Sequence, residues 1–240
     1  MDSKEVLHLY ESFFNVLKTA EESSEEVFAW FTDIPHPLFN TIMHVNSEEN
    51  LSYYSSKSKQ AISIWTHEFS PLSKLQNFFQ KYAYHLTASC PLMAYNLDFD
   101  EITKVNKHIE ITRDEIFYRI VATAFSFDET IKNSYKTLFE QLPEVENYLI
   151  FEDSVPVGAG SLHPKQNIGA IFNVGVLPTY QKKGYGRLLV EFLLNRAREL
   201  NLIKIILQST PIGVNLYTRL GFKKILDVDI YVKQGSKSLF

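Results

Sequence analysis

Residues 169–189 read Gly-Ala-Ile-Phe-Asn-Val-Gly-Val-Leu-Pro-Thr-Tyr-Gln-Lys-Lys-Gly-Tyr-Gly-Arg-Leu-Leu. Within this stretch, the apolar and β-branched run Ile171–Val176 predicts a strand. Pro178 ends that strand, because proline has no N–H to donate to a neighbouring strand. A polar loop with two glycines follows over 181–186. Apolar residues then recur at helical spacing, which predicts a helix over about 186–200.

A strand, a glycine loop and a helix start in succession suit the binding of an anion. The first turn of a helix has N–H groups without intrahelical partners, and the helix dipole places partial positive charge there. Gly184 and Gly186 let a bulky anion approach the backbone, and Lys182, Lys183 and Arg187 add positive charge. The stretch therefore predicts a phosphate site, although a plain turn before a helix would carry the same glycines.

Two common phosphate motifs do not fit this loop. A dinucleotide fingerprint needs a third glycine where Leu189 stands, and a P-loop needs Gly-Lys followed by Ser or Thr. What remains is Gln-x-x-Gly-x-Gly over 181–186, preceded by Val-x-Val-x-Pro over 174–178. This combination resembles the acyl-CoA pyrophosphate loop of the GNAT superfamily of acyl-CoA-dependent N-acetyltransferases.

A second segment supports the same resemblance. Residues 215–222 read Asn-Leu-Tyr-Thr-Arg-Leu-Gly-Phe, after a predicted strand at 203–208. A short helix is expected over 214–220, with Gly221 in the left-handed position that follows a helix. The segment is similar to Asn-x-x-Tyr-x-x-x-Gly-Phe of the superfamily, although Asn215 and Tyr217 are two residues apart rather than three. Order, spacing and residue types of both segments match together.

The resemblance implies a fold and a reaction. The fold would be α+β in three layers, GNAT-like, with a mixed and mostly antiparallel sheet. The activity would be acetyl-CoA-dependent N-acetyltransfer, in which an amine of a small molecule or protein attacks the thioester directly. Tyr217 would act as the general acid that protonates the departing CoA thiolate, since a phenol can supply that proton.

The resemblance also implies a set of residues that hold acetyl-CoA as co-substrate. Backbone groups of Val174, Gly175 and Val176 would pair with the pantetheine arm, and the N–H of Val174 or a neighbour would polarise the thioester carbonyl. Asn215 would hydrogen-bond the donor. The loop that would bind the phosphates comprises Gln181, Lys182, Lys183, Gly184, Tyr185, Gly186 and Arg187.

The general base is not evident from the sequence. Many relatives carry a glutamate on the strand before the loop, whereas here Asn173 is the polar side chain of that strand. Asp128, Glu129 and His163 are candidates by location, with His163 expected in a turn before Pro164. A water relay, or an acceptor amine that arrives neutral, would also serve.

Two domains are expected, over 1–100 and 108–240. After a helix at 3–19, the first contains a strand, a helix, a strand, a helix capped by Ser70-Pro71, and a further strand. This order is similar to the C-terminal half of the GNAT fold without its glycine loop, so a partial, degenerate copy is expected; a plain helical extension is the alternative. The elements expected in the second domain before the glycine loop are strands at 108–112, 148–152 and 157–163, helices at 113–125 and 131–141, and an acceptor-binding loop at 126–129.

The composition limits the partners, disulfides and cellular location that the protein can have. The net charge of −4 gives no case for nucleic acid or an anionic membrane as partner. The single cysteine, Cys90, excludes an intramolecular disulfide, and a buried apolar role for it is favoured over a nucleophilic one. No apolar run of 18 residues or signal-peptide start is present, so a cytoplasmic protein is expected, without a metal, as monomer or homodimer.

Two other functions stay open at this point. A catalytically inactive CoA-binding module, regulatory or structural, would fit the missing carboxylate on the strand at 169–176. A phosphate binder or interaction protein that does not use CoA would fit the aromatic-rich N-terminal half.

Overall fold

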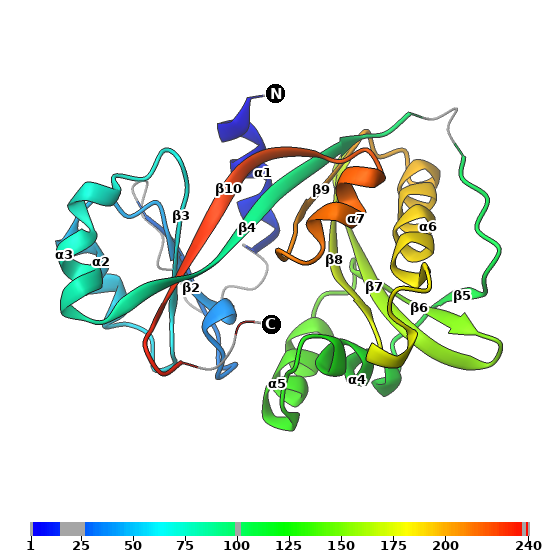
Figure 1. Ribbon diagram of the computed structural model, residues 1–240, viewed down its shortest axis with the longest axis horizontal. Helices are drawn as coiled ribbons and strands as arrows, with labels where there is room; N and C mark the ends of the chain where they lie inside the picture. Colours follow the sequence, from blue (N-terminus) through cyan, green and yellow to red (C-terminus); the bar gives the residue numbers. More distant parts are fainter. Residues whose placement is uncertain (1, 15–26, 99–101, 237–238, 240) are drawn as a thin grey trace.

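The described residues form ten strands in one sheet. The computed structural model describes residues 2–14, 27–98, 102–236 and 239. Neighbouring strands are antiparallel, except for the parallel pairs β2/β3 and β8/β9. The order across the sheet is β1-β2-β3-β10-β4-β9-β8-β7-β6-β5 (Figure 1). The expected α+β class with a mixed, mostly antiparallel sheet is confirmed.

Apart from β1, which was not expected from the sequence, the elements follow the expected order along the chain. The strands are β1 Phe28–Phe31, β2 Asn40–Met43, β3 Ser63–Thr66, β4 Tyr84–Asn96, β5 Ile109–Ile111, β6 Glu146–Glu152, β7 Val155–Lys165, β8 Ile168–Val176, β9 Lys204–Gln208 and β10 Lys223–Lys233. The helices are α1 Ser3–Phe14, α2 Glu48–Ser55, α3 Gln76–Lys81, α4 Glu115–Ala124, α5 Glu129–Phe139, α6 Tyr185–Glu199 and α7 Val214–Arg219. No described helix is long and apolar enough to cross a membrane.

Helices cover both faces of the sheet beside the glycine loop. Leu149 on β6 packs in the same cluster as the buried residues of α4 and α5. The next residue, Ile150, packs in the cluster of α6. Because successive strand residues point to opposite faces, α4 and α6 lie on opposite sides of the sheet. The three layers expected from the sequence are therefore present.

The long strands β4 and β10 connect the two halves of the molecule. They pair antiparallel from Tyr84 opposite Lys233 to Ala94 opposite Lys223, with two register shifts. In Figure 1 both strands run across the middle of the molecule, from the α2–α3 end to the α7 end. Strand β10 lies between β3 and β4, so the sheet is continuous across the boundary expected near residue 100.

The sheet has a symmetric order about this central pair. Strands β1, β2 and β3 lie on one side of this pair, and β7, β8 and β9 lie on the other. In each set the first two strands are antiparallel and the last two are parallel. Helix α2 connects the parallel strands of one set, and α6 those of the other. Helix α3 precedes β4 as α7 precedes β10. The connection from β2 to α2, residues 44–47, contains no glycine, unlike its counterpart at 177–184. The division into 1–100 and 108–240 stays a prediction, with this symmetry in its favour.

Several expected boundaries differ from the structure. Ser70 and Pro71 do not cap a helix: the Ser70 hydroxyl accepts a hydrogen bond from the His67 backbone N–H (3.0 Å), and α3 starts later, at Gln76. Residues 223–233, for which the sequence predicts the terminal strands, form one long strand, because it pairs with both β3 and β4. The expected helix at 3–19 is α1 as far as Phe14, and the rest lies outside the described residues.

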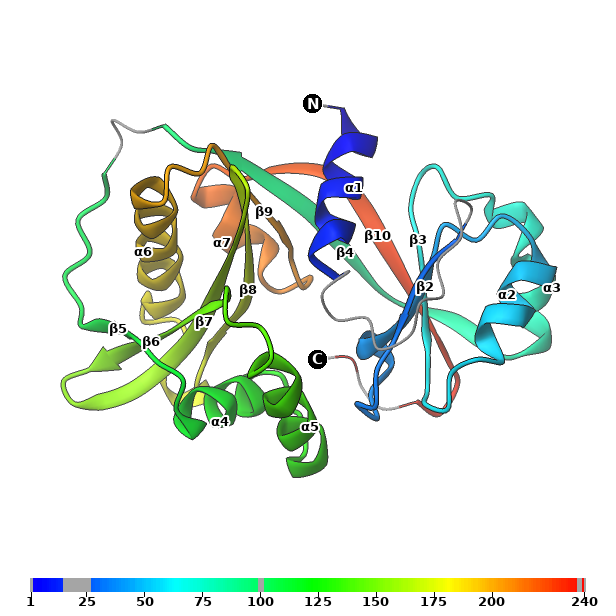
Figure 2. The ribbon, with the colours of Figure 1, turned by 180° about the vertical axis from the view of Figure 1, so that it is seen from behind.

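Helix α1 lies between the two halves in both views (Figures 1 and 2). Its buried side chains Val6, Leu7, Tyr10 and Phe13 join a core cluster that includes β4 and β10 residues. Phe14 stacks on Trp30 of β1 with ring centroids 4.6 Å apart. The hydrophobic effect therefore holds α1 against elements from both ends of the chain.

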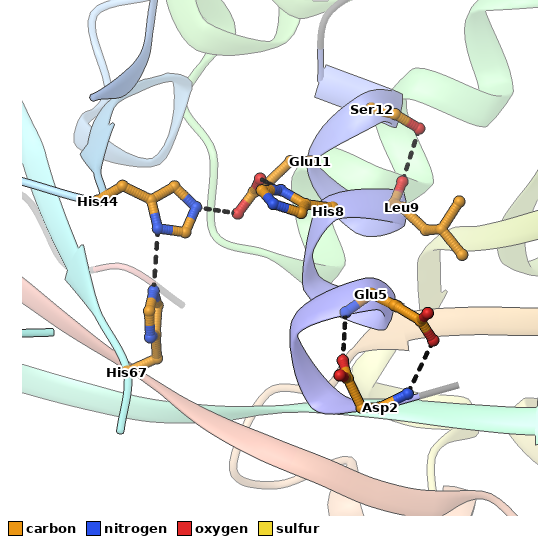
Figure 3. A network of polar contacts seen from close by, with 8 residues as sticks. All are labelled: Asp2, Glu5, His8, Leu9, Glu11, Ser12, His44 and His67. Atoms are coloured by element: carbon orange, nitrogen blue, oxygen red, sulfur yellow. Dashed lines mark hydrogen bonds and ion pairs between the residues drawn. The ribbon is translucent and has the colours of Figure 1, made fainter. Parts of the chain in front are cut away.

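A chain of hydrogen bonds attaches the other side of α1 to the N-terminal half (Figure 3). The Phe69 backbone N–H donates to Nδ1 of His67 (3.2 Å), which leaves the proton of a neutral His67 on Nε2. That N–H donates to Nδ1 of His44 (3.2 Å), and Nε2 of His44 then donates to the buried Glu11 carboxylate. His8 contacts the second Glu11 oxygen at 3.0 Å. The neutral form of His67 thus sets the direction of every hydrogen bond from Phe69 to Glu11.

We expect the hydrogen bonds that link His67, His44 and Glu11 to make the stability of the fold depend on pH. Burial, and secondarily the neighbouring His44, lower the pKa of His67 from 6.5 to about 4. Between these values the unfolded state binds a proton that the folded state does not, so the free energy of unfolding falls as pH is lowered from 6.5 towards 4. Urea denaturation at several pH values measures this.

The matched variant is His67→Gln, whose amide can donate the same hydrogen bond without titrating. It should lose less stability than the wild type over that pH range. Parallel losses in the two proteins would contradict the role of His67.

Candidate active site

Strands β8 and β9 pair at one end and separate at the other. Their register covers Ile168–Ala170 opposite Lys204–Ile206. Beyond this point β8 stays paired with β7, as Gly158 with Val176 and Ala159 with Gly175. The edge of β8 towards β9 is therefore open over the residues expected to face the pantetheine arm. An open edge can pair with an extended ligand as an added strand would.

A bulge at Asn173 marks the separation. Asn173 has φ of 59°, a left-handed conformation that asparagine tolerates better than most residues. The β7–β8 register shifts once here, between the pair Ser161–Phe172 and the pair Ala159–Gly175. Its side chain accepts a hydrogen bond from the Tyr135 hydroxyl (2.6 Å) and donates to Oγ of Ser161 (2.9 Å). Asn173 therefore fixes the bulge rather than replacing a catalytic carboxylate.

The glycine loop ends in an open helix N-terminus. Gly184 precedes α6 with φ of 92°, and the first bond of the helix runs from the N–H of Leu188, which donates to the Gly184 carbonyl (3.1 Å). The N–H groups of residues 185–187 precede this first bond and thus have no intrahelical acceptor. The amide of Gln181 donates to the Val176 carbonyl (3.1 Å), which ties the loop to β8. This arrangement suits a phosphate.

The basic residues of the loop differ in availability. Lys182 and Lys183 are exposed, and the ammonium of Lys183 lies 4.9 Å from the centroid of the Tyr180 ring. Arg187 forms an ion pair with Glu191, one helical turn further on, at 2.8 Å. Part of its charge is compensated within α6, so the two lysines are better placed for an incoming phosphate.

The space available to a side chain differs between two glycines of the site, Gly175 and Gly186. A Cβ at Gly175 would lie 2.6 Å from Cβ of Ala124 on α4, so packing requires glycine there. A Cβ at Gly186 would meet Leu216 at 3.6 Å and Val176 at 3.8 Å, which are ordinary contacts. Packing therefore does not explain Gly186, and its predicted role at a phosphate stays a prediction.

Tyr217 lies on α7, with its position set by the end of that helix. The N–H of Phe222 donates to the Tyr217 carbonyl (3.0 Å) and that of Gly221 to the Thr218 carbonyl (3.1 Å). With Gly221 at φ of 92°, this is a Schellman motif, and the left-handed conformation predicted for Gly221 is confirmed. Tyr217 is 8% exposed, and burial raises the pKa of its phenol, so the group stays protonated at neutral pH.

Asn215 is exposed and does not line the cavity that Tyr217 reaches. Side chains of helical residues that are two positions apart point to different sides of the helix, whereas those three or four positions apart share a face. The altered spacing of the motif thus separates this residue from Tyr217. Its role towards the donor stays a prediction.

A cavity of about 260 Å³ lies where β8 and β9 separate. Tyr217, Asn173 and Val174 line it on one side. Much of the rest comes from the N-terminal half, namely Tyr10, Phe14, Trp30, Phe39, Trp65 and Cys90. Burial raises the pKa of Cys90 to about 12, which agrees with the buried, non-nucleophilic role expected for it. The only sign in the sequence of this part of the cavity lining is the large number of aromatic residues in the N-terminal half.

Of the candidate bases, His163 is the one that reaches the cavity among the described residues. Asp128 caps α5, accepting from the Ile131 N–H (2.9 Å), and Glu129 pairs with Lys132 (2.8 Å). His163 does not lie in a turn: strand β7 runs through it to Lys165. Burial lowers its pKa, so the imidazole is neutral at neutral pH and able to accept a proton.

One described group has side chains of the types that bind metals. His8, Glu11 and His44 place a ligand atom each within 4.8 Å of one another (Figure 3). The hydrogen bonds described above, however, put a proton on Nε2 of His44 rather than a free lone pair. The donors are complete without an ion, so the group is better described as a hydrogen-bond chain.

Comparison with known proteins identifies the class to which this site belongs. Residues 115–222 match the sequence model described as the acetyltransferase (GNAT) family. The match runs from the first residue of α4 to the residue before β10. The chain therefore contains a GNAT acetyltransferase domain, as its two motifs indicate.

Solved structures extend the likeness to nearly the whole chain. A GCN5-related N-acetyltransferase from Kribbella flavida superposes with a TM-score of 0.67 at 14% identity, covering 96% of each chain. A conserved protein of unknown function from Staphylococcus epidermidis gives 0.66 at 13% identity, covering 90% of this chain and 94% of that one. A GCN5-related N-acetyltransferase from Sphaerobacter thermophilus gives 0.61 at 12% identity, covering 88% and 77%. At these identities the likeness concerns the fold. A search of curated proteins finds no match.

The packing of Gly175 is directly testable. Gly175→Ala should lower the free energy of unfolding by about 1–3 kcal/mol, because the added methyl overlaps Ala124. Gly186→Ala is the matched control, with room for its methyl group at the start of a helix, and should be neutral or stabilising by up to about 1 kcal/mol. Denaturant unfolding of both variants measures this, and equal effects would contradict the geometry.

Proposed function

We propose that this protein is an acetyl-CoA-dependent N-acetyltransferase whose acceptor is an amine. The observation that carries the proposal is the conjunction of three features at one place: the open edge of β8, the open N-terminus of α6, and the buried Tyr217. The family match of residues 115–222 supports it. Each feature serves a different part of one thioester substrate.

The donor would lie along β8, with its pyrophosphate at the start of α6. Its pantetheine arm would pair with the backbone of Val174, Gly175 and Val176, on the edge that β9 leaves open. The N–H groups of residues 185–187 and the side chains of Lys182 and Lys183 would hold the phosphates. The backbone N–H at Val174, next to the bulge, would polarise the thioester carbonyl.

Attack of the amine nitrogen on the thioester carbon would form a tetrahedral intermediate, and cleavage of the C–S bond would release the CoA thiolate. Tyr217 would donate its phenolic proton to that sulfur. Burial of Tyr217 keeps the phenol protonated before the reaction. Pre-positioning in a cavity without described charged side chains favours this local transfer over transfer from bulk water.

The amine has to be neutral before it attacks. The described residues that line the cavity include no Asp or Glu, and His163 is the base among them. Deprotonation would therefore fall to His163, to water, or to the solution before the amine enters. A catalytically inactive CoA-binding module is the second candidate, favoured by this lack of a carboxylate.

Loss of the Tyr217 hydroxyl should separate binding from chemistry. Tyr217→Phe should lower kcat by about 100-fold or more, while the Kd for acetyl-CoA in a calorimetric titration stays within about twofold. Thiol release with an amine panel measures turnover. The control is Gly186→Glu, which places bulk and negative charge at the phosphate site and should abolish acetyl-CoA binding.

Three results would count against the proposal. Full turnover by Tyr217→Phe would exclude the phenol as the acid. Acetyl-CoA binding by the wild type with no thiol release for any amine would favour the inactive module. Absence of acetyl-CoA binding would reject both functions.

The pH dependence of kcat/KM should follow the pKa of the acceptor amine. If the amine loses its proton in solution and not to a group of the enzyme, kcat/KM rises with pH and levels off near the pKa of the free amine used. Two acceptors of similar shape but different amine pKa should therefore plateau at different pH values. Rates measured from pH 6 to 10 test this, and a common plateau for both amines would indicate an enzyme base instead.

A further inference from the structure

We propose that the acceptor is an amine attached to a ring-sized apolar body that also bears an oxygen, as in a hydroxylated arylalkylamine. This inference rests on the proposed function and names the substrate class of the same site. It comes from the aromatic wall of the cavity, much of which the N-terminal half supplies, and from one polar atom of β9 that lines the same cavity.

The wall is aromatic and built from both halves. Trp30 and Trp65 cross at 89° with centroids 5.3 Å apart. On the opposite side, Phe39 lies 5.5 Å from Tyr135 of α5, ring centroid to ring centroid. Both tryptophans and Phe39 line the cavity. Such surfaces favour flat, apolar groups through burial and edge-to-face contacts.

The N-terminal half holds this wall rigidly. Asn40 is fully buried, and its side chain accepts from the Thr32 N–H (2.8 Å) and donates to the carbonyls of Ile34 (2.8 Å) and His36 (3.1 Å). These bonds close the turn that carries Leu38 and Phe39 into the cavity wall. A wall fixed in this way selects by shape rather than adapting to any amine.

Charge is lacking where a polar amine would need it. The described lining residues include no Asp, Glu, Lys or Arg. A polyamine, or an amino acid with its carboxylate, would leave a second charge in this apolar cavity without a partner, at a large desolvation cost. An amine with one basic nitrogen and an apolar body carries no such second charge.

Gln208 supplies the polar atom. Its Oε1 accepts a hydrogen bond from the hydroxyl of Tyr10 (2.9 Å), which joins β9 to α1. Its Nε2 is buried and has no hydrogen-bond partner, although Gln208 lines the cavity. A buried donor left unpaired is costly, so an oxygen on the ligand would gain by accepting from it. The unpaired amide thus predicts a hydrogen-bond acceptor on the substrate.

Binding can be measured without turnover. The chain has two tryptophans, and both line the cavity, so ligand entry should change intrinsic tryptophan fluorescence. We expect saturable changes with tyramine and with 2-phenylethylamine, and none with putrescine or lysine over the same concentrations. Thiol release from acetyl-CoA with the same four amines is measured in parallel.

Two variants test the polar atom. Tyramine should bind about 2- to 10-fold tighter than 2-phenylethylamine to the wild type, the range expected for one hydrogen bond. Gln208→Leu should abolish this ratio. Tyr10→Phe, the matched control, removes the same Tyr10–Gln208 bond but leaves the amide donor, so the ratio should persist. Far-ultraviolet circular dichroism and thermal unfolding verify that both variants fold.

The outcomes separate this inference from the proposed function. Saturable binding of the aromatic amines without thiol release would support the cavity's substrate class and reject the transfer reaction. Transfer to putrescine or lysine in preference to the aromatic amines would overturn the inference while leaving acetyl transfer intact. No saturable fluorescence change with either aromatic amine, or a tyramine preference unchanged in Gln208→Leu, would also overturn it.

Discussion

The antiparallel pairing of β4 with β10 is the constraint on which the rest of the structure depends. These strands belong to different halves of the chain, yet each is hydrogen-bonded to the other over most of its length. Because β10 also pairs with β3, and β4 with β9, the two halves share one sheet. Strand ladders of this kind cannot slide by one residue without turning every side chain to the wrong face. The halves are therefore held in one relative position.

The shared sheet makes it possible for two different kinds of surface to meet. The C-terminal half supplies open backbone: the free edge of β8, the bulge at Asn173 and the start of α6. The N-terminal half supplies side chains, chiefly aromatic, that close the far side of the cavity. Neither half encloses the cavity by itself, since α1 packs against both ends of the chain.

The sequence predicted those parts of the site whose causes are local. The strand, the glycine loop and the helix after it follow from residue periodicity and from proline and glycine chemistry over about twenty residues. Gly221 was predicted in a left-handed position because a helix end requires such a residue there. Tyr217 followed from its place in a motif. The structure places it, buried, in the cavity wall.

Other features were not predicted from the sequence, whether their partners lie near to or far from them along the chain. Arg187 turns to Glu191 rather than to the loop, and Ser70 accepts from the backbone of His67 instead of capping a helix. His163 lies in a strand because β8 pairs with it, although a following proline suggested a turn.

What the sequence alone determined is the class of fold and the location of the glycine loop, since both arise from short-range patterns of apolar residues, glycine and proline. Only the tertiary structure decided the shape and chemistry of the cavity. Tyr10 and Gln208 are 198 residues apart and meet through a hydrogen bond. Such a contact arises when β4 and β10 bring the halves together, and no local pattern encodes it.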